Sequence, residues 1–475
     1  MTTLIIFTGQ LYELNKLQSL KKISFSHYVV FEEILFSGAD PARKLNFNPL
    51  KLAYQRACMK WYYDWIRENI SKSVEYVDYA NIKDWVGDKH ETFVAFDTTD
   101  RILNERLKAA NISIIESHSF IIKHEALQSI PKFTSFYIHY RKKFDILMSK
   151  SKPMGGKYTY DNQNRERIPA NKILKDRIEP ISPQLNSYYE EAQKYVHTLT
   201  GINIDLDILK LYPISHDGAK QLCTNFIESK LKNFGPYQDF VSKDYQQLYH
   251  SELSIPLNMG LLNPINIMNL VISKLTKQNL HSVEAFVRQL FWREYVRMHY
   301  VFNYTKIVKN KLNNTTKISE KFYTASTQIE PVDACIKHAF KYGYLNHISR
   351  LMIMCNFMNL CRIHPDNIYR WFMEFSLDSY DWVMIFNVYA MGTYADGGNY
   401  TTKPYICSSN YILKMTNFPR GDWCPIFDAL YYNFIYKNYS VFKNRGKIFC
   451  SQWDRLSSIE KTKRKTIANL FISKI

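Results

Sequence analysis

Two serines spaced three residues apart form the first candidate for a binding site, in the segment His250-Ser251-Glu252-Leu253-Ser254. At the start of a helix this spacing lets both hydroxyl groups face one anion, and the free backbone N–H groups there favour phosphate. The same residues would also serve as an ordinary helix cap without any ligand. The segment therefore indicates either a phosphate contact through Ser251 and Ser254 or a capped helix.

A second candidate lies on one face of a helix that the apolar spacing predicts over residues 282–300. Helical spacing places Gln289, Trp292, Arg293 and Val296 on that face. A tryptophan beside an arginine and an amide suits the stacking of a planar ring together with contact to an anion. The alternative is a tryptophan in the core and an arginine in an ion pair, and this pattern alone leaves both open.

The composition favours a protein that meets polyanions and planar groups. The chain has 475 residues, 46% hydrophobic and 22% charged, which is ordinary for a soluble protein of two or three domains. Aromatic residues make up 15%, which suits stacking on flavin or bases but also fits an AT-rich genome. The net charge of +18 attracts polyanions, so nucleic acid is the first expected partner and an anionic membrane the second.

The cysteines and the apolar runs indicate in which cellular compartment the protein is expected. The eight cysteines contain no Cys-x-x-Cys pair and no cluster with zinc spacing, so we expect free thiols in a reducing compartment. No apolar run reaches the roughly 18 residues that a membrane span needs. The opening MTTLIIFTGQL lacks a basic leader and a cleavage site, so we expect a core strand and no signal peptide. These features predict a soluble protein of the cytoplasm or nucleus.

The elements that must position the candidates are of two kinds. Up to about residue 145, strand-like runs alternate with helical segments, which predicts an α/β domain with a mainly parallel, Rossmann-like sheet. The predicted strands cover 3–8, 28–31, 74–77, 92–95 and 112–115, and a predicted helix covers 50–69.

Beyond about residue 215 the chain is mostly helical. The predicted helices cover 282–300, 332–342, 345–362, 366–376 and 426–437. The polar stretch between the two parts contains the pair Gly155-Gly156 and predicts a long connection. We therefore expect an α/β domain over 1–145, an inter-domain connection over 146–215 and an all-α domain over 216–475.

The order of these segments resembles that of the iron–sulfur bacterial cryptochromes and photolyases, also called prokaryotic (6-4) photolyases. The matching text is HSELS…LNMGLLNP, EAFVRQLFWREYVR, GYLNHISRLMIMCNF, DSYDWVMIFNVYAMGTYADGG and KPYICSSNYI. The resemblance covers nearly the whole chain and is specific from about 250 to 435. It implies the photolyase–cryptochrome fold, with an antenna-type α/β domain followed by an all-α catalytic domain that binds FAD.

The resemblance also implies which residues hold the flavin. The FAD diphosphate would lie near Ser251 and Ser254, and Arg293 would face its phosphates. Arg350 would lie near the isoalloxazine ring, and Asp378 would accept a hydrogen bond from the ring edge. Hydroxyl groups and arginines suit a diphosphate, and a carboxylate suits a ring N–H.

Two further positions belong to the same cofactor-binding set. Met384 matches the residue that faces flavin N5, where the family often has glutamate, and Asn387 lies one turn further along the chain. Because the methionine removes a carboxyl group, we expect a different behaviour of the neutral flavin radical.

The lesion side of the site follows from the same resemblance. In the family, light-excited reduced FAD passes an electron to a DNA lesion that is flipped out of the stack. A histidine then donates a proton, a task that suits its pKa. The family's His-His pair reads Asn346-His347 here, so one histidine remains. The other lesion-site residues that carry over are Gln289, Tyr405, Tyr411 and Asp161.

Electron transfer to the flavin uses tryptophan and tyrosine in the family. The matching positions are Tyr323, Trp371 and Phe372, of which Trp371 and Tyr323 are the expected relays because phenylalanine is hard to oxidise. The family's four-cysteine cluster is not matched: its first position reads Pro331, with Cys335 one helical turn away, and Cys424 alone remains of the later pair. Because a cubane needs four thiolates, we predict that the iron–sulfur cluster is absent and that no metal is bound.

The resemblance also implies an antenna cofactor and a binding partner. The family binds 6,7-dimethyl-8-ribityllumazine in its N-terminal domain, and Gly9-Gln10-Leu11 and Glu32-Glu33 match its opening motifs. The expected partner is UV-damaged DNA, bound by a monomer through phosphate contacts. The basic residues expected to contact it lie at 141–143, at 157–167 and in the run 443–465.

The predicted function is light-dependent DNA repair, by electron transfer from reduced FAD to a (6-4) pyrimidine photoproduct. Asn346, Met384 and the lost cluster keep an alternative open, namely a cryptochrome-like blue-light photoreceptor or DNA-binding flavoprotein without repair activity. A purely structural nucleic-acid binder is a third possibility, and it would show no flavin in a visible absorption spectrum.

Overall fold

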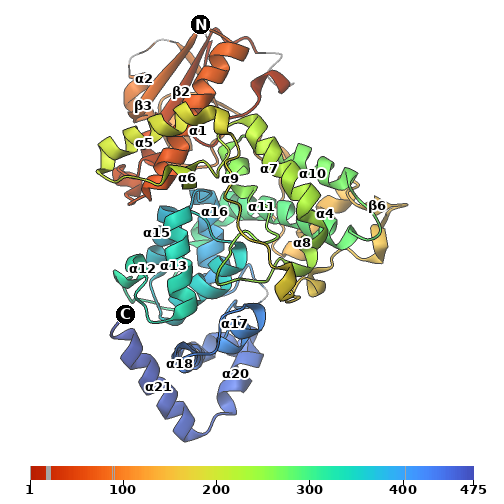
Figure 1. Cartoon of the computed structure of the whole chain (residues 1–475), viewed down its shortest axis with the longest axis vertical. Helices are drawn as coiled ribbons and strands as arrows, with labels where there is room; N and C mark the ends of the chain where they lie inside the picture. Colours follow the sequence, from red (N-terminus) through yellow and green to blue (C-terminus); the bar gives the residue numbers. More distant parts are fainter. Residues whose placement is uncertain (1, 18–22, 88, 90, 402) are drawn as a thin grey trace.

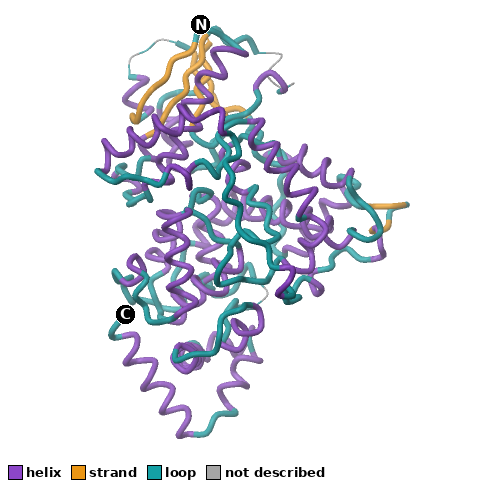
Figure 2. The backbone as a smooth tube through the Cα atoms, viewed as in Figure 1, coloured by secondary structure: helices purple, strands orange, loops and turns teal. Residues whose placement is uncertain are grey.

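Five parallel strands form a sheet in the N-terminal part of the chain, and helices build nearly all the rest (Figures 1 and 2). The computed structural model describes residues 2–17, 23–87, 89, 91–401 and 403–475. The strand order is β3-β2-β1-β4-β5, with bounds β1 (Thr2–Phe7), β2 (His27–Glu33), β3 (Val74–Ala80), β4 (Thr92–Phe96) and β5 (Ser113–Ile115). Each predicted strand is confirmed, and so is the parallel, Rossmann-like sheet.

Apolar side chains explain why β1 lies at the centre of the sheet. Leu4, Ile5, Ile6 and Phe7 are all fully buried, as expected for a parallel strand with both faces covered. β1 pairs in parallel with β2 on one side and with β4 on the other. The strand order therefore reverses direction beside β1, which is where open α/β sheets form a crevice.

One helix packs on this sheet and a second helix packs on the first (Figure 1). α1 (Pro49–Asn69) packs against β2 and β3, and α5 (Asn186–Thr200) packs against α1. The predicted connection over 146–215 thus contains a helix of the N-terminal layer. Its signal was present in the helical spacing of the buried residues Tyr189, Ala192 and Val196.

The predicted helices after residue 215 are confirmed, with shifted ends. α11 (Leu280–Ile307) is the central helix and contacts α4 (Phe133–Lys143), α8, α10 and α16. The other α-helices of the described residues are α2 (Ile82–Val86), α3 (Arg101–Ala109), α6 (Leu206–Leu209), α7 (His216–Ser229), α8 (Leu231–Tyr237), α9 (Ser254–Met259), α10 (Pro264–Ser273), α12 (Lys321–Thr324), α13 (Glu330–Tyr342), α14 (Asn356–Leu360), α15 (Pro365–Phe375), α16 (Asp381–Ile385), α17 (Ser409–Met415), α18 (Trp423–Lys437), α19 (Tyr439–Arg445), α20 (Lys447–Asp454) and α21 (Ser458–Ile472).

Two π-helical turns interrupt the regular helices of this part. The helix predicted over 345–362 begins as the π-helix η10 (Ser349–Cys355) and continues as α14. A second π-helix, η11 (Phe386–Gly392), follows α16 and packs against η10. Such widened turns are rare and occur often at functional sites, so this pair marks a place to look for one.

The last helices form a separate layer at the C-terminal end (Figure 1). α18 packs against α20 and α21, and Phe357 of α14 contacts both Phe427 and Phe471, at ring-centroid distances of 5.9 and 6.1 Å. Cys424 lies in this layer, 2% exposed. Within the described part of the chain, no three His, Cys, Asp or Glu side chains are grouped to hold a metal ion. The loss of the iron–sulfur cluster stays a prediction.

No helix among the described residues is both long enough and apolar enough to span a membrane.

Candidate functional site

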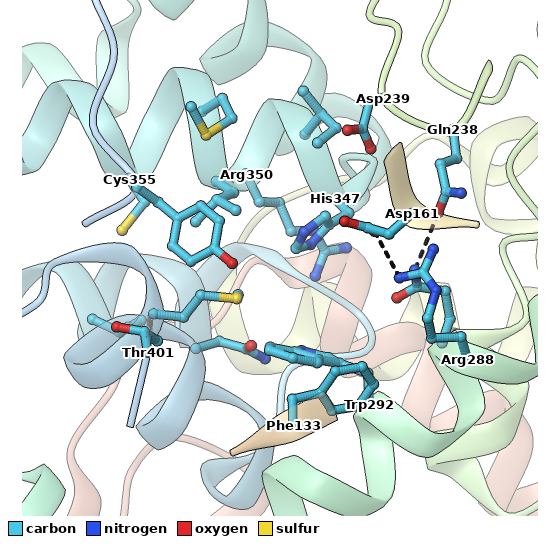
Figure 3. A pocket seen from close by; sticks show the side chains of 18 of the residues that line it. Phe133, Asp161, Gln238, Asp239, Arg288, Trp292, His347, Arg350, Cys355 and Thr401 are labelled. Carbon is cyan, nitrogen blue, oxygen red and sulfur yellow. Dashed lines mark hydrogen bonds and ion pairs between the residues drawn. The ribbon is translucent and has the colours of Figure 1, made fainter. Parts of the chain in front are cut away.

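A large cavity of about 1120 Å³ lies among the helices of the C-terminal part (Figure 3). Its walls come from the start of α4, the segments 159–165 and 250–254, α11, both π-helices and the stretch 398–411. Pockets for small molecules usually measure about 300–1,000 Å³. The cavity is therefore large enough for a ligand of dinucleotide size.

Most of the predicted site residues lie on the wall of this cavity. They are Asp161, Ser251, Ser254, Gln289, His347, Arg350, Asp378, Met384, Asn387, Tyr405 and Tyr411. Four predicted residues do not line it: Arg293, Asn346, Trp371 and Tyr323.

A buried ion pair on the cavity wall joins the π-helix η10 to the segment between α15 and α16. The Arg350 guanidinium donates to both oxygens of Asp378, at 2.8 and 3.2 Å, and Asp378 also accepts from Ser254 Oγ at 2.6 Å and Ser376 Oγ at 2.5 Å. Burial raises the pKa of Asp378, but Arg350 and the two serines outweigh it and hold that pKa below its usual range. Asp378 is thus a fixed negative charge.

The two serines of the first candidate segment both face the cavity. Ser251 Oγ accepts from the backbone N–H of Leu253 at 3.3 Å, which forms a turn at the start of α9. Ser254 donates to Asp378, so its hydroxyl group is part of the ion-pair network. Ser251 therefore forms the turn at the start of α9 and also lines the cavity. Contact of Ser251 and Ser254 with phosphate stays a prediction.

Arg293 lies away from the cavity, in contrast to the prediction. Its Nε and Nη2 donate to Asn258 Oδ1 at 3.2 and 3.1 Å, and its Nη1 donates to the backbone oxygen of Ser119. The guanidinium packs over the rings of Phe120 and Trp382, 4.6 and 4.8 Å from their centroids. Arg293 therefore ties α11 to α9 and to the loop after β5.

The neighbouring residues of α11 make the same connection. Glu294 accepts from the backbone N–H groups of Ile121 and Ile122, at 3.0 and 3.2 Å, and Arg297 donates to the Ile122 oxygen at 2.6 Å. Burial lowers the pKa of Arg293 to about 10. Sequence reasoning missed this because the partners lie some 170 positions away along the chain.

Asn346 also points away from the cavity and caps a helix. It is fully buried, its Nδ2 donates to the backbone and side-chain oxygens of Gln246, and its Oδ1 accepts from Ser349 N at 2.9 Å. His347, the next residue, is exposed and faces the cavity. Its surface is open to the cavity, but the surrounding protein walls desolvate the ring, and this desolvation, followed by the charge of Arg350, lowers the pKa of His347 to about 4. The substitution at 346 thus affects the start of η10, while His347 keeps its place on the wall.

Further polar residues on the wall were not predicted. Arg288 pairs with Asp161, at 3.0 Å (Figure 3), and Arg165 pairs with Asp239, at 3.5 Å. Burial raises the pKa of Asp239 to about 6. His250 lines the cavity too, and its Nε2 is buried without a hydrogen-bond partner among the described residues. These pairs join distant segments, so local sequence gave no signal for them.

A row of aromatic rings leads from the cavity wall toward the surface. Phe372 lines the cavity, and its ring lies 5.1 Å from that of the fully buried Trp371. The ring of Phe340 lies 6.1 Å from Trp371 and 5.9 Å from the half-buried Tyr323. The two predicted relays are therefore connected through Phe340, and Trp371 is the oxidisable ring nearest the cavity in this row.

If the cavity holds the flavin that the family resemblance implies, replacement of Trp371 by phenylalanine is expected to slow its photoreduction strongly, because the row of rings then lacks its only indole. Laser-flash absorption of the oxidised protein with an external reductant measures this rate. Tyr323→Phe is expected to have a smaller effect on this rate. The variant keeps the aromatic ring that packs against Phe340, so we expect it to fold as the wild type does. An unchanged rate in Trp371→Phe would mean that electrons enter by another route.

The motifs expected at the antenna are engaged within the protein. Gln10 accepts from Phe7 N at 3.1 Å and donates to Phe96 O at 2.9 Å, so it joins β1 to β4. Glu32 pairs with Arg56 at 2.9 Å and Glu33 with Arg106 at 2.5 Å. Leu11 N donates to Met259 O at 3.1 Å, which docks the loop after β1 on α9. Binding of the ribityllumazine there stays a prediction.

Of the basic residues expected to contact DNA, Arg141 is a correction. It is 1% exposed and donates to three backbone oxygens, so it cannot reach a phosphate, and the expectation is wrong for this residue. Lys142 and Lys143 are exposed. In the C-terminal layer, Lys465 packs over Tyr436 at 4.1 Å and Arg464 over Tyr432 at 4.4 Å.

Comparison with known proteins gives these features a context. The family model for deoxyribodipyrimidine photo-lyase-related protein matches residues 4–204, and the model for the FAD binding domain of DNA photolyase matches residues 286–442. The (6-4) photolyase of Agrobacterium fabrum is 30% identical over 356 residues, which are 72% of this chain and 70% of that protein. An uncharacterized protein of Acanthamoeba polyphaga mimivirus is 69% identical over 105 residues, 22% of this chain and 85% of that protein.

Solved structures show the same fold. A bacterial class III photolyase from Agrobacterium tumefaciens covers 100% of this chain and 98% of its own, with a TM-score of 0.59 and 13% identity. A cryptochrome of Synechocystis sp. has the same TM-score at 14% identity, over 98% of this chain and 93% of its own. The chain therefore belongs to the photolyase–cryptochrome family and is a relative of the bacterial (6-4) photolyases.

Proposed function

We propose that this protein repairs (6-4) pyrimidine photoproducts in DNA with light, using FAD bound in the cavity. The observation that carries the proposal is the gathering of His347, Gln289, Tyr405, Tyr411 and Asp161 on one cavity wall with the Arg350–Asp378 pair. The pair supplies fixed charges for a flavin. The aromatic and polar residues suit a flipped-out base, which is read by stacking and by hydrogen bonds.

The residues present fit FAD. The cavity has the necessary size, Asp378 offers a charged acceptor, and the unpartnered Nε2 of His250 is a buried polar atom without a protein partner among the described residues. Arg350, Asp378, Ser254 and Asn387 would hold the cofactor. Reduced FAD, when bound, supplies an electron on excitation.

The protein's own residues then position the lesion and move protons. Trp292, with its ring 4.4 Å from that of Phe133, offers an aromatic surface on the wall for stacking. His347 holds a nitrogen toward the lesion and is neutral at pH 7, since its pKa is about 4. The negative charge of docked DNA raises that pKa and so favours proton donation.

A second candidate is a photoreceptor that binds DNA without repair. The observation that favours it is Met384, which is 4% exposed on the cavity wall at the position expected to face flavin N5. A thioether has no proton to give, so the flavin would lack a neighbouring acid there. This candidate predicts photoreduction and DNA binding without lesion turnover.

The test is illumination of the reduced protein with an oligonucleotide that carries a (6-4) lesion, with product followed by chromatography. We expect restored thymines above the dark control, and we expect His347→Gln to lose nearly all turnover while it keeps its flavin absorbance and DNA affinity. His124→Gln is the matched control, at an exposed histidine that does not line the cavity, and its turnover is expected to match the wild type. Turnover that is unchanged in His347→Gln would remove His347 from the reaction, and no product in the wild type would favour the photoreceptor.

A further inference from the structure

We propose that a basic hairpin beside the cavity, residues 142–157, binds the phosphate backbone of the DNA duplex a few base pairs away from the flipped nucleotide. We call this segment the basic arm. It contains the two-stranded ladder of β6 (Met148–Ser149) and β7 (Lys152–Pro153), which projects from the body of the molecule (Figures 1 and 2). The inference rests on the proposed function in one respect, that DNA docks over the cavity.

The chain leaves the cavity wall to form the arm and then returns to it. Thr134 and Tyr137 of α4 line the cavity before the arm, and Thr159 and Asp161 line it afterwards. Tyr137 lies on the wall and Lys142 follows five residues later on α4, so at about 1.5 Å per residue the arm begins roughly 7–8 Å from the wall. At about 3.4 Å of rise per base pair, this distance corresponds to about two base pairs along a duplex whose damaged nucleotide enters the cavity, and the turn of the projecting hairpin lies further out (Figure 1).

A buried arginine fixes the arm at its base. Arg141 donates from Nε to Ile146 O at 3.1 Å, from Nη2 to Leu147 O at 2.6 Å and from Nη1 to Tyr158 O at 2.7 Å. Met154 N donates to Leu147 O at 2.9 Å, which closes the loop below the ladder. These bonds hold the entering and leaving strands together. Binding to a prepared arm costs less ordering than binding to a free loop.

The exposed charged side chains of the arm are almost all cationic. Between residues 141 and 160 five lysines are exposed and one acid, Asp145, opposes them. The lysines are Lys142, Lys143, Lys150, Lys152 and Lys157. Lys150 and Lys152 lie at the turn of the hairpin, where Ser149 pairs with Lys152. From Lys150 to Lys157 no carboxylate lies between the lysines, and point charges of one sign suit phosphates without any sequence choice.

Continuity with the cavity favours DNA over an anionic membrane as the partner. The arm exposes one large apolar side chain, Phe144, at 39%, which offers little surface for insertion into lipid. The arm is continuous with the cavity wall on both sides, through Tyr137 before it and Thr159 after it.

The experiment measures dark binding of a fluorescent undamaged duplex of about 20 base pairs by anisotropy over a range of salt concentrations. The variant is the full chain with Lys150→Ala and Lys152→Ala. The matched control is Lys72→Ala with Lys83→Ala, two exposed lysines of the N-terminal sheet region that do not line the cavity. Flavin absorbance and the melting temperature check that each variant is folded.

We expect the arm variant to bind roughly tenfold more weakly at low salt, and its plot of log affinity against log salt to be shallower by about 2, because each lost phosphate contact removes about 0.9 from the slope. The control is expected to match the wild type. An unchanged slope in the arm variant overturns the inference, as does an equal loss in the control. A loss of binding to anionic vesicles with unchanged DNA binding overturns it in favour of a membrane.

The outcome is separable from that of the repair assay. If lesions are not repaired but the arm variant loses dark affinity for DNA, the arm is confirmed and the repair function fails. If lesions are repaired and the arm variant binds DNA as the wild type does, the inference about the basic arm is wrong and the proposed repair function stands. At saturating DNA the arm variant is expected to turn over lesions at the wild-type rate.

Discussion

Replacement of Asp378 by alanine is expected to abolish flavin binding and to lower the free energy of unfolding by about 3–5 kcal/mol, since it leaves the Arg350 guanidinium without its partner. Arg350 is 15% exposed and Asp378 7% exposed as side chains, so little water replaces the lost contacts. Ser254 and Ser376 also lose their acceptor. Visible absorbance of the purified protein and urea unfolding measure the two effects.

The same ion pair makes the free energy of unfolding depend on pH in the acidic range. The pKa of Asp378 is lower in the folded protein than the value of about 3.9 in an unfolded chain. The stability contributed by the carboxylate is therefore fully present above about pH 4 and is lost as pH falls through the lower folded pKa. Asp378→Asn is expected to show a smaller loss of stability than the wild type on acidification over this window, because it has no carboxylate to protonate.

Asp217→Ala is the matched control for this prediction. Asp217 is 94% exposed as a side chain and pairs with Lys220 at 3.2 Å, and exposed pairs of this kind contribute about 0–1 kcal/mol. We expect this variant to keep its flavin and its unfolding free energy. Flavin retained in Asp378→Ala at wild-type occupancy would show that the Arg350–Asp378 pair does not shape the cofactor site.

The parts of the fold that follow from local pattern were predictable. The apolar run of β1 and the helical periodicity of α11 each depend on neighbouring residues alone, and both elements appear where they were expected. The resemblance to a family added the positions of the wall residues, such as Arg350 and His347. The proton-bearing and charged groups that face one cavity come from segments more than 200 residues apart, and only the fold brings them together.

Arg293 and Asn346 differ from their predicted positions for a common physical reason, which is competition among acceptors for their hydrogen-bond donors. Arg293 carries a guanidinium that suits phosphates, but Asn258 and the Ser119 backbone oxygen use it in the structure. Asn346 follows the same rule, because its amide satisfies the backbone of η10 and the buried Gln246. Sequence tells which donors exist, whereas the fold decides which acceptor each of them meets.

The contact between the two π-helices rests on a glycine, and this leads to the second large effect. A Cβ atom added to Gly392 of η11 would lie 2.3 Å from Cys355 Sγ of η10 and 3.0 Å from Asn387 O. Real Cβ atoms essentially never make contacts as short as the first of these, so either the Cys355 side chain must turn away or the two π-helices must separate. Both helices line the cavity, through Cys355 and Met352 on one side and Met391 on the other.

Gly392→Ala is therefore expected to reduce flavin occupancy sharply and to cost about 1–3 kcal/mol of stability through overpacking. The double variant Gly392→Ala with Cys355→Ala removes the sulfur and is expected to recover much of both losses, although the contact with Asn387 O at 3.0 Å remains. A double-mutant cycle of unfolding free energies isolates this coupling from the effect of Cys355→Ala alone. Gly421→Ala, where the nearest atom lies 3.3 Å away, is the control. Additive effects of the two substitutions would show that η10 and η11 do not depend on this close approach.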